Sequence, residues 1–133
     1  MDKIFDTLRG KYVALTPEEV VRQKFVNFLI HEKGYPQPLL ANEVELRCGG
    51  KKMRCDTVVY KADGLKPVMI VEYKAPQVEI TQRVFNQVLD YNSILKVPYL
   101  IMFNGNSFFC CKTGGNGNYE FLNEIPEYRE LLL

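Results

Sequence analysis

The stretch PVMIVEYK, residues 67–74, decides the fold because its character changes sharply near its end. Residues 67–71 are apolar without alternation, which is typical of a strand buried on both faces in the middle of a sheet. Glu72 and Lys74 then place opposite charges one residue apart, so both side chains project from the same face of the strand. Two charges at the end of a buried strand predict a site for polar chemistry at that edge of the sheet.

The preceding hairpin adds a second carboxylate. The pair Gly49-Gly50 separates two strand-like segments, residues 44–48 and 54–60, which is typical of a β-hairpin. Asp56 lies near the start of the second segment. If this segment pairs antiparallel with the charged strand, two carboxylates and an ammonium group converge at one end of the sheet.

Two helices are predicted on either side of these strands. Thr16 can cap a helix that begins at Pro17 and runs to about Glu32, with Glu19 at the capping-box position. A second helix is expected over residues 81–96. The apolar positions expected to be buried are Val21, Phe25, Phe28 and Leu29 in the first helix and Val84, Phe85, Val88, Leu89 and Ile94 in the second. The positions of the first helix expected to face outward are Arg22, Lys24 and Asn27.

Two more strands complete the predicted order. Residues 99–103 and 108–112 have strand character and flank an Asn-Gly-Asn turn, and the helical character of the tail, residues 125–133, is left open. The order α-β-β-β-α-β-β predicts an α/β fold with a mixed central sheet flanked by helices. With 47% hydrophobic and 25% charged residues, the 133-residue chain is expected to form one domain, with a core over about 16–112 and a tail over 119–133.

Charge and cysteine content exclude several classes of protein. Lys and Arg number 17 against 16 Asp and Glu, so the net charge of +1 lacks the basic excess of a protein permanently bound to DNA. The four cysteines form no CxxC pair and the chain has one histidine, so no zinc site is expected and the thiols are expected to be reduced. No apolar run has signal-peptide or transmembrane length, which predicts a cytoplasmic protein without membrane contact.

The charged group has the composition of a site for a hard metal ion. Mg²⁺ prefers oxygen ligands, so Asp56 and Glu72 are its expected ligands, with Mn²⁺ as a substitute. Lys74 could orient or help deprotonate an attacking water and compensate phosphate charge, because the pKa of a buried lysine shifts readily. This combination suits hydrolysis of a phosphodiester bond. The alternative is an ordinary charged strand end exposed to solvent.

The ordered set of Asp56, the ExK triplet at Glu72 to Lys74, and Gln87 with Tyr91 on the second helix resembles the PD-(D/E)xK nuclease pattern with its QxxxY extension. Three segments resemble more narrowly the N-terminal nuclease domain of type I restriction enzyme R subunits: RCDTVVY (54–60), IVEYKAP (70–76) and YLIMFNG (99–105). The resemblance covers about residues 16–112. It departs from the motif's name at residue 55, where a cysteine replaces the proline.

The resemblance implies a restriction-endonuclease-like fold and a set of roles. Asp56 and Glu72 would be metal ligands, Lys74 the catalytic lysine, and Gln87 and Tyr91 supports for DNA or for the active site. Gln87 and Tyr91 stand four residues apart and so share a helix face, although Tyr91 could equally be a core residue. In the same families an acidic residue of the first helix can join the site. This makes Glu19 a candidate ligand, with helix capping as the alternative role.

DNA is the expected partner. The basic residues Lys51, Lys52 and Arg54, beside the hairpin turn, could contact the DNA backbone, although a solvated turn would have the same composition. R subunits also carry a helicase motor, whereas these 133 residues contain no GxxxxGK[ST] segment. A motor or a specificity subunit could act in trans, or the motor could have been lost.

Three functions remain open. The first is a Mg²⁺-dependent DNA endonuclease or nuclease subunit of a restriction or DNA-processing system. The second is a catalytically silent module of the same fold that binds DNA or a protein. The third is a structural or homodimerising domain that uses Phe108, Phe109 and residues 131–133 as an interface.

Overall fold

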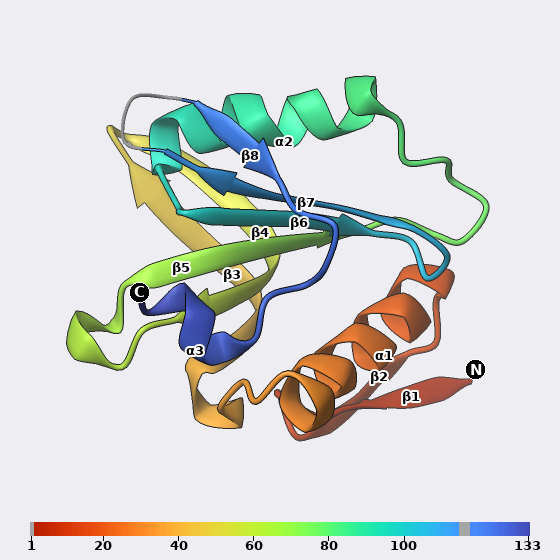
Figure 1. Cartoon of the computed structure of the whole chain (residues 1–133). Coiled ribbons are helices and arrows are strands. Elements are labelled where there is room, and N and C mark those ends of the chain that lie inside the picture. The colour runs from red at the N-terminus through yellow and green to blue at the C-terminus, as the bar shows by residue number, and fades with distance from the viewer. Residues whose placement is uncertain (1, 115–117) are drawn as a thin grey trace.

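A mixed β-sheet separates two helical layers in the computed structural model (Figure 1). The structure describes residues 2–114 and 118–133, and within them all side chains except those of Cys48, Tyr91, Ser93 and Ile94. Among the described residues, the sheet contains six strands in the order in which they follow along the chain. These are β3 Leu40–Cys48, β4 Lys51–Tyr60, β5 Pro67–Tyr73, β6 Tyr99–Phe103, β7 Phe108–Thr113 and β8 Tyr119–Phe121. The helices are α1 Pro17–Glu32, α2 Gln82–Leu95 and α3 Tyr128–Leu131, with short 3-10 turns at Gln37–Leu39 and Asp63–Leu65. None of the described helices is long and apolar enough to cross a membrane.

Strand β5 lies in the middle of the sheet and brings the charged residues to its carboxyl end. It pairs antiparallel with β4, where Thr57 lies opposite Val71. It pairs parallel with β6, where Met69 lies opposite Tyr99, because α2 forms the crossover between them. The antiparallel pairing of the strand that carries Asp56 with the strand that carries Glu72 is therefore confirmed.

The two faces of the sheet are buried under different helices. Helices α1 and α3 lie on one face and α2 on the other (Figure 1). Cys110 belongs to the core under α1 and Cys111 to the core under α2, as alternation along a strand requires. The described cysteines Cys55, Cys110 and Cys111 are free thiols and are buried.

Helix α1 begins as predicted but buries a different face. The hydroxyl of Thr16 accepts a hydrogen bond from the main-chain N–H of Glu19 at 3.1 Å, which confirms the cap. Arg22, predicted to face outward, is buried, whereas Phe28, predicted to be buried, is 36% exposed. The reason is that polar groups of β3 and β4 meet the helix at Arg22 and bind its guanidinium.

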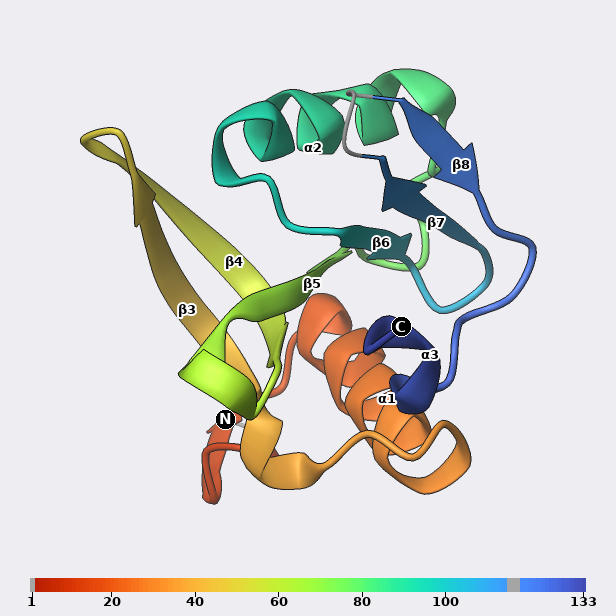
Figure 2. The ribbon, with the colours of Figure 1, turned by 60° about the vertical axis from the view of Figure 1, so that its left-hand side comes forward.

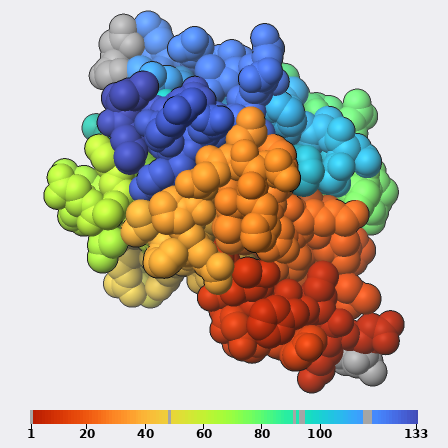
Figure 3. All heavy atoms as spheres, turned by 60° about the horizontal axis from the view of Figure 1, so that its bottom comes forward, coloured from red at the N-terminus to blue at the C-terminus, as the bar shows by residue number. Residues whose placement is uncertain are grey.

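The predicted order omits three strands. Strands β1 Lys3–Asp6 and β2 Lys11–Ala14 form a separate hairpin before α1, and β8 pairs antiparallel with β7 at the edge of the sheet. These strands have only three or four residues and mostly exposed side chains, so they carry almost no hydrophobic periodicity. Figure 3 shows the N-terminal hairpin (red) as a lobe against α1 (orange). The tail contains one helical turn, α3.

The residues considered as a dimer interface are largely used inside the chain. Phe109 packs edge-on against Phe85, with 5.3 Å between ring centroids, and Leu131 is buried in the core under α1. Phe108 packs partly against the same core. Leu132 and Leu133 are exposed. The apolar surface that this interface would need is therefore smaller than the sequence suggested.

Candidate active site

The carboxylates of Asp56 and Glu72 meet at the carboxyl end of β5. Asp56 Oδ2 accepts a hydrogen bond from the main-chain N–H of Tyr73 at 2.9 Å, which places this carboxylate beside the neighbouring Glu72. Burial, followed by the negative charge of Asp56, raises the pKa of Glu72 from 4.5 to about 9, and Lys74 opposes the shift. A cation bound between the two carboxylates would relieve this repulsion.

Lys74 extends the pairing of β5 with β6 by one residue. Its main-chain N–H donates to the carbonyl of Phe103 at 3.0 Å, so its backbone is fixed although it follows the end of the strand. The loop after it is also tethered, because the side-chain amide of buried Asn104 donates to the carbonyl of Val78 at 2.9 Å. The positions of Glu72 and Lys74 are thus set by the sheet rather than by a free loop.

Glu72, Lys74 and Gln87 open into one pocket of about 500 Å³ between the β3–β4 hairpin and α2. Gln87 reaches it from an exposed position on α2. The pocket has an apolar wall made by Met53, Cys55, Ile70, Val84, Val88, Leu95, Leu100 and Met102. Figure 2 shows the outer end of the hairpin on the same side of the sheet as α2, next to the C-terminal end of that helix. The side chain of Tyr91, the fifth predicted site residue, lies outside the described part of the chain.

Two of the three basic hairpin residues also line this pocket, namely Lys52 and Arg54. Arg54 Nε donates to Glu43 Oε2 at 2.8 Å, and its side chain is 76% exposed. Lys52 lies 3.9 Å from Glu45, also at the surface. Lys51 is exposed and does not line the pocket. The pocket therefore combines an acidic end with a basic rim.

The donor set fits a magnesium ion. Within residues 2–114 and 118–133, no group of three or more His, Cys, Asp or Glu side chains is placed to hold a metal. Asp56 and Glu72 provide two hard oxygen donors, and Mg²⁺ commonly binds to one or two carboxylates while keeping several waters or substrate oxygens. The site thus suits an ion that shares its coordination with a phosphate better than one that needs a closed protein cage.

Comparison with protein families assigns the chain. Residues 17–126 match the model of the type I restriction enzyme R protein N terminus. The chain belongs to this family. The match includes α1 and every strand from β3 to β8, so all the candidate site residues lie within it. A search of curated proteins found no match.

Solved structures share the fold at low sequence identity. One is the crystal structure of a candidate nuclease of the DUF820 group from Anabaena variabilis, with 14% identity, a TM-score of 0.53, and coverage of 86% of this chain and 74% of that one. Another is a cryo-EM structure of DrdV in complex with DNA, with 14% identity and a TM-score of 0.54. It covers 88% of this chain and 11% of the DrdV chain. The chain therefore shares its fold with these two structures.

Among the described residues, Glu19 is not gathered with Asp56 and Glu72 as a third acidic ligand. Its carboxylate forms an ion pair with Arg22 and accepts a hydrogen bond from Gln23 Nε2 at 3.0 Å. The structure thus corrects the expected placement of Glu19, because the buried guanidinium holds its carboxylate. The carboxylate is also not turned back to cap the helix.

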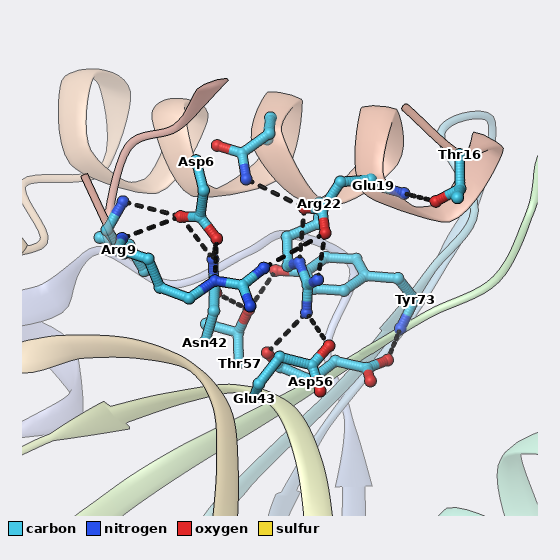
Figure 4. A network of polar contacts seen from close by, with 12 residues as sticks. Asp6, Arg9, Thr16, Glu19, Arg22, Asn42, Glu43, Asp56, Thr57 and Tyr73 are labelled. Atoms are coloured by element: carbon cyan, nitrogen blue, oxygen red, sulfur yellow. Dashed lines mark hydrogen bonds and ion pairs between the residues drawn. The ribbon is translucent and has the colours of Figure 1, made fainter. Parts of the chain in front are cut away.

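Arg22 is the residue of this region that sequence reasoning missed. Figure 4 shows its guanidinium between Glu19 of α1, Glu43 of β3 and the main chain of Asp56. The three-residue spacing of Glu19 and Arg22 was a sequence signal for an ion pair on one helix face. It did not indicate that this face is buried.

A second polar chain leads from the site to the N-terminal hairpin. The hydroxyl of Tyr73 donates to Thr57 Oγ1 at 2.9 Å, and that hydroxyl donates to Asn42 Oδ1 at 2.7 Å. Asn42 Nδ2 then donates to Asp6 Oδ1 at 3.1 Å (Figure 4). These hydrogen bonds connect buried polar side chains from β5 to β1, each bonded to the next. Among the described residues, no buried side-chain N or O atom lacks a hydrogen-bond partner.

Proposed function

We propose that this chain is a metal-dependent deoxyribonuclease, or the nuclease part of a restriction or DNA-processing assembly. The observation that carries the proposal is the meeting of Asp56 and Glu72 across two paired strands. Glu72 and Lys74 both line the pocket, and Asp56 lies behind them and does not line it. Family membership and a restriction-related nuclease fold support it.

Asp56 and Glu72 would hold a Mg²⁺ ion. When bound, this ion would supply Lewis-acid stabilisation of phosphate charge and lower the pKa of a coordinated water. Glu72 is suited to bind a cation, because burial and the neighbouring Asp56 make its ionised form costly while no cation is bound. Mn²⁺ would substitute, since it accepts the same oxygen donors.

The other residues of the pocket would handle the phosphodiester backbone. Lys74 would neutralise charge on the scissile phosphate or orient the attacking water. Gln87 can donate to a phosphate oxygen without adding charge. Lys52 and Arg54 on the rim would contact neighbouring phosphates, which positions a nucleic acid without reading its sequence. The DNA complex of DrdV, a structural neighbour, makes DNA the substrate to test.

Cleavage of supercoiled plasmid tests the proposal. Wild type would be compared with Glu72→Gln and Lys74→Met, with and without EDTA, in Mg²⁺ and in Mn²⁺. Glu79→Gln is the matched control, because it removes an exposed carboxylate that does not line the pocket. We expect nicking by wild type and Glu79→Gln, and loss of nicking in the two site variants and in EDTA. Nicking that persists in Glu72→Gln would contradict the proposed site.

If wild type cleaves nothing, a partner remains to be tested. The assay would then be repeated with the motor or specificity subunits of a type I system added in trans. Cleavage that appears only with the added subunits and is lost in Glu72→Gln would identify a nuclease subunit. Wild type that stays inactive with them, while binding DNA, would support the silent binding module instead.

A further inference from the structure

The pairing of β3 with β4 is interrupted at Asp56. The pairing of β3 with β4 runs from Asn42–Thr57 to Val44–Cys55 and omits the intervening pair of Glu43 with Asp56. Glu43 has a φ of 57°, a left-handed conformation that costs free energy for any residue with a side chain. The sheet is thus interrupted at the position of a candidate metal ligand.

Arg22 binds the groups at this interruption. Its Nη1 donates to the carbonyl oxygen of Asp56 at 3.2 Å and to Glu43 Oε1 at 2.7 Å. A main-chain carbonyl without its partner in the sheet is thereby satisfied by a side chain. The same guanidinium contacts the strained residue of β3 and the main chain of its neighbour on β4.

The guanidinium is itself fixed from the helix side. Arg22 Nε donates to Glu19 Oε2 at 2.9 Å, and Nη2 pairs with Glu19 Oε1, so the two groups form a bidentate pair. The side chain of Arg22 is only 8% exposed. A planar group with five donors can span both carboxylates and the carbonyl at once, whereas a lysine ammonium cannot reproduce this geometry.

We propose that Arg22 is a positioning residue: it fixes the main chain at Asp56 and thereby keeps the carboxylate of Asp56 beside Glu72 and against the N–H of Tyr73. An effect of Arg22 on metal binding rests on the function proposed above, because the affinity for a metal held by Asp56 would depend on where this carboxylate lies. Arg22 would hold Asp56 in this way whether or not the site binds a metal. If Arg22 only stabilised the fold as a whole, its replacement would accelerate amide exchange to a similar extent in all parts of the sheet.

Arg9 provides a matched control. It belongs to the same ionic network, where it pairs with Asp6 and lies 3.4 Å from Glu19, but it makes no hydrogen bond to Asp56. Arg9→Met therefore removes a guanidinium from the network without releasing the main chain of Asp56. Arg22→Lys keeps the charge of Arg22, and Arg22→Met removes it.

The first measurement is amide hydrogen exchange in the metal-free protein, read at Tyr73 and at Leu100 in the middle of β6. In Arg22→Lys and Arg22→Met we expect exchange at Tyr73 to accelerate by about tenfold relative to Leu100, because its acceptor on Asp56 is no longer held. Arg9→Met should leave this ratio near the wild-type value. An unchanged ratio in the Arg22 variants would overturn the proposal, as would failure of both variants to fold.

The second measurement is the Kd for Mn²⁺, which separates this inference from the proposed function. We expect it to rise by about tenfold in Arg22→Lys and to stay unchanged in Arg9→Met. If wild type binds no Mn²⁺ but the exchange ratio changes in the Arg22 variants, Arg22 positions Asp56 and the proposed metal site is wrong. If wild type binds Mn²⁺ and the Arg22 variants change neither the exchange ratio nor the Kd, the metal site is supported and the positioning role of Arg22 is wrong.

Discussion

The main-chain N–H of Tyr73 donates to Oδ2 of Asp56 at 2.9 Å, so the residue between Glu72 and Lys74 orients the carboxylate of the neighbouring strand. This bond uses one oxygen of Asp56. A single backbone contact therefore links the two strands that provide the candidate ligands, and it gives the site a geometry that does not depend on a flexible loop.

Loss of the Asp56 carboxylate as a hydrogen-bond acceptor should lower the free energy of unfolding. Asp56→Ala leaves the N–H of Tyr73 without its partner, whereas Asp56→Asn keeps an oxygen that can accept the bond. We expect the alanine variant to be less stable than the asparagine variant by about 1–2 kcal/mol, because both remove the negative charge of Asp56 but only the alanine removes the acceptor for the N–H of Tyr73. Urea unfolding in EDTA at pH 7 measures the difference. Equal stabilities would mean that the bond contributes nothing.

Glu72 should make the metal-free protein less stable as the pH rises. Its pKa of about 9 in the folded chain, against an ordinary 4.5, means that the folded state binds the proton more tightly than the unfolded state. The free energy of unfolding should therefore fall between these two pH values, and Glu72→Gln should remove most of that fall. At pH 9 we expect the variant to be the more stable protein by roughly 1 kcal/mol, allowing for solvent screening.

Thermal unfolding between pH 4.5 and pH 9 in EDTA tests this dependence. Parallel curves for wild type and Glu72→Gln would show that Glu72 does not titrate as described. Added Mg²⁺ provides a further check, because a ligand of the folded state raises Tm. We expect this increase in wild type and its absence in Glu72→Gln.

Asp6 should stabilise the chain from outside the segment matched to the family, residues 17–126. Its side chain is fully buried and accepts hydrogen bonds from the main-chain N–H groups of Leu8 and Arg9 at 2.9 and 3.0 Å. Asp6→Ala removes these acceptors together with those for Asn42, which should cost about 2–3 kcal/mol.

The part of the stabilisation that depends on the ionised carboxylate of Asp6 should be lost in acid. Burial alone would raise its pKa, but hydrogen bonds from Arg9 and Asn42 outweigh this effect and hold the pKa below 3.8. The stabilisation is therefore fully present at neutral pH and is lost as the pH falls through the lowered pKa. Unfolding of wild type and Asp6→Ala from pH 7 to pH 2 should show a gap that narrows only at the acidic end. A gap independent of pH would contradict this explanation.

The buried thiols should be unreactive in the native chain. Burial raises the pKa of Cys55 and of Cys110 to about 12 and that of Cys111 to about 11, so little thiolate forms at pH 8. In a Cys48→Ser background we expect a disulfide reagent to label these three thiols at least about 100-fold more slowly than in urea. Rapid labelling without denaturant would show that the sheet opens readily.

Regular elements were predictable because their signals are local. The cap at Thr16, the apolar run of β5 and the turn at Gly49-Gly50 each specify structure within a few residues. The strands β1, β2 and β8 were missed because short, exposed segments acquire strand structure only by pairing. The antiparallel pairing of β4 with β5 was predicted from an order of elements, and it places Asp56 beside Glu72.

The buried polar residues that hold the site in place, such as Arg22, could not be predicted in the same way. Arg22 follows Val21 on α1, and helical periodicity alone assigns it to the outer face. Its burial depends on Glu43 and the carbonyl of Asp56, which come from strands that lie far along the chain and meet the helix only in the folded state. A pattern within one helix cannot contain that information. The same holds for Asp6, whose partner Asn42 lies on β3.

Binding of Mn²⁺ to the purified chain, followed by electron paramagnetic resonance, tests the central claim most directly, because it needs neither DNA nor a partner subunit. Wild type and Glu79→Gln should bind the ion with the same Kd, and Asp56→Asn and Glu72→Gln should each weaken binding by at least about tenfold. Binding that survives unchanged in both site variants would contradict the assignment of Asp56 and Glu72 as the metal ligands.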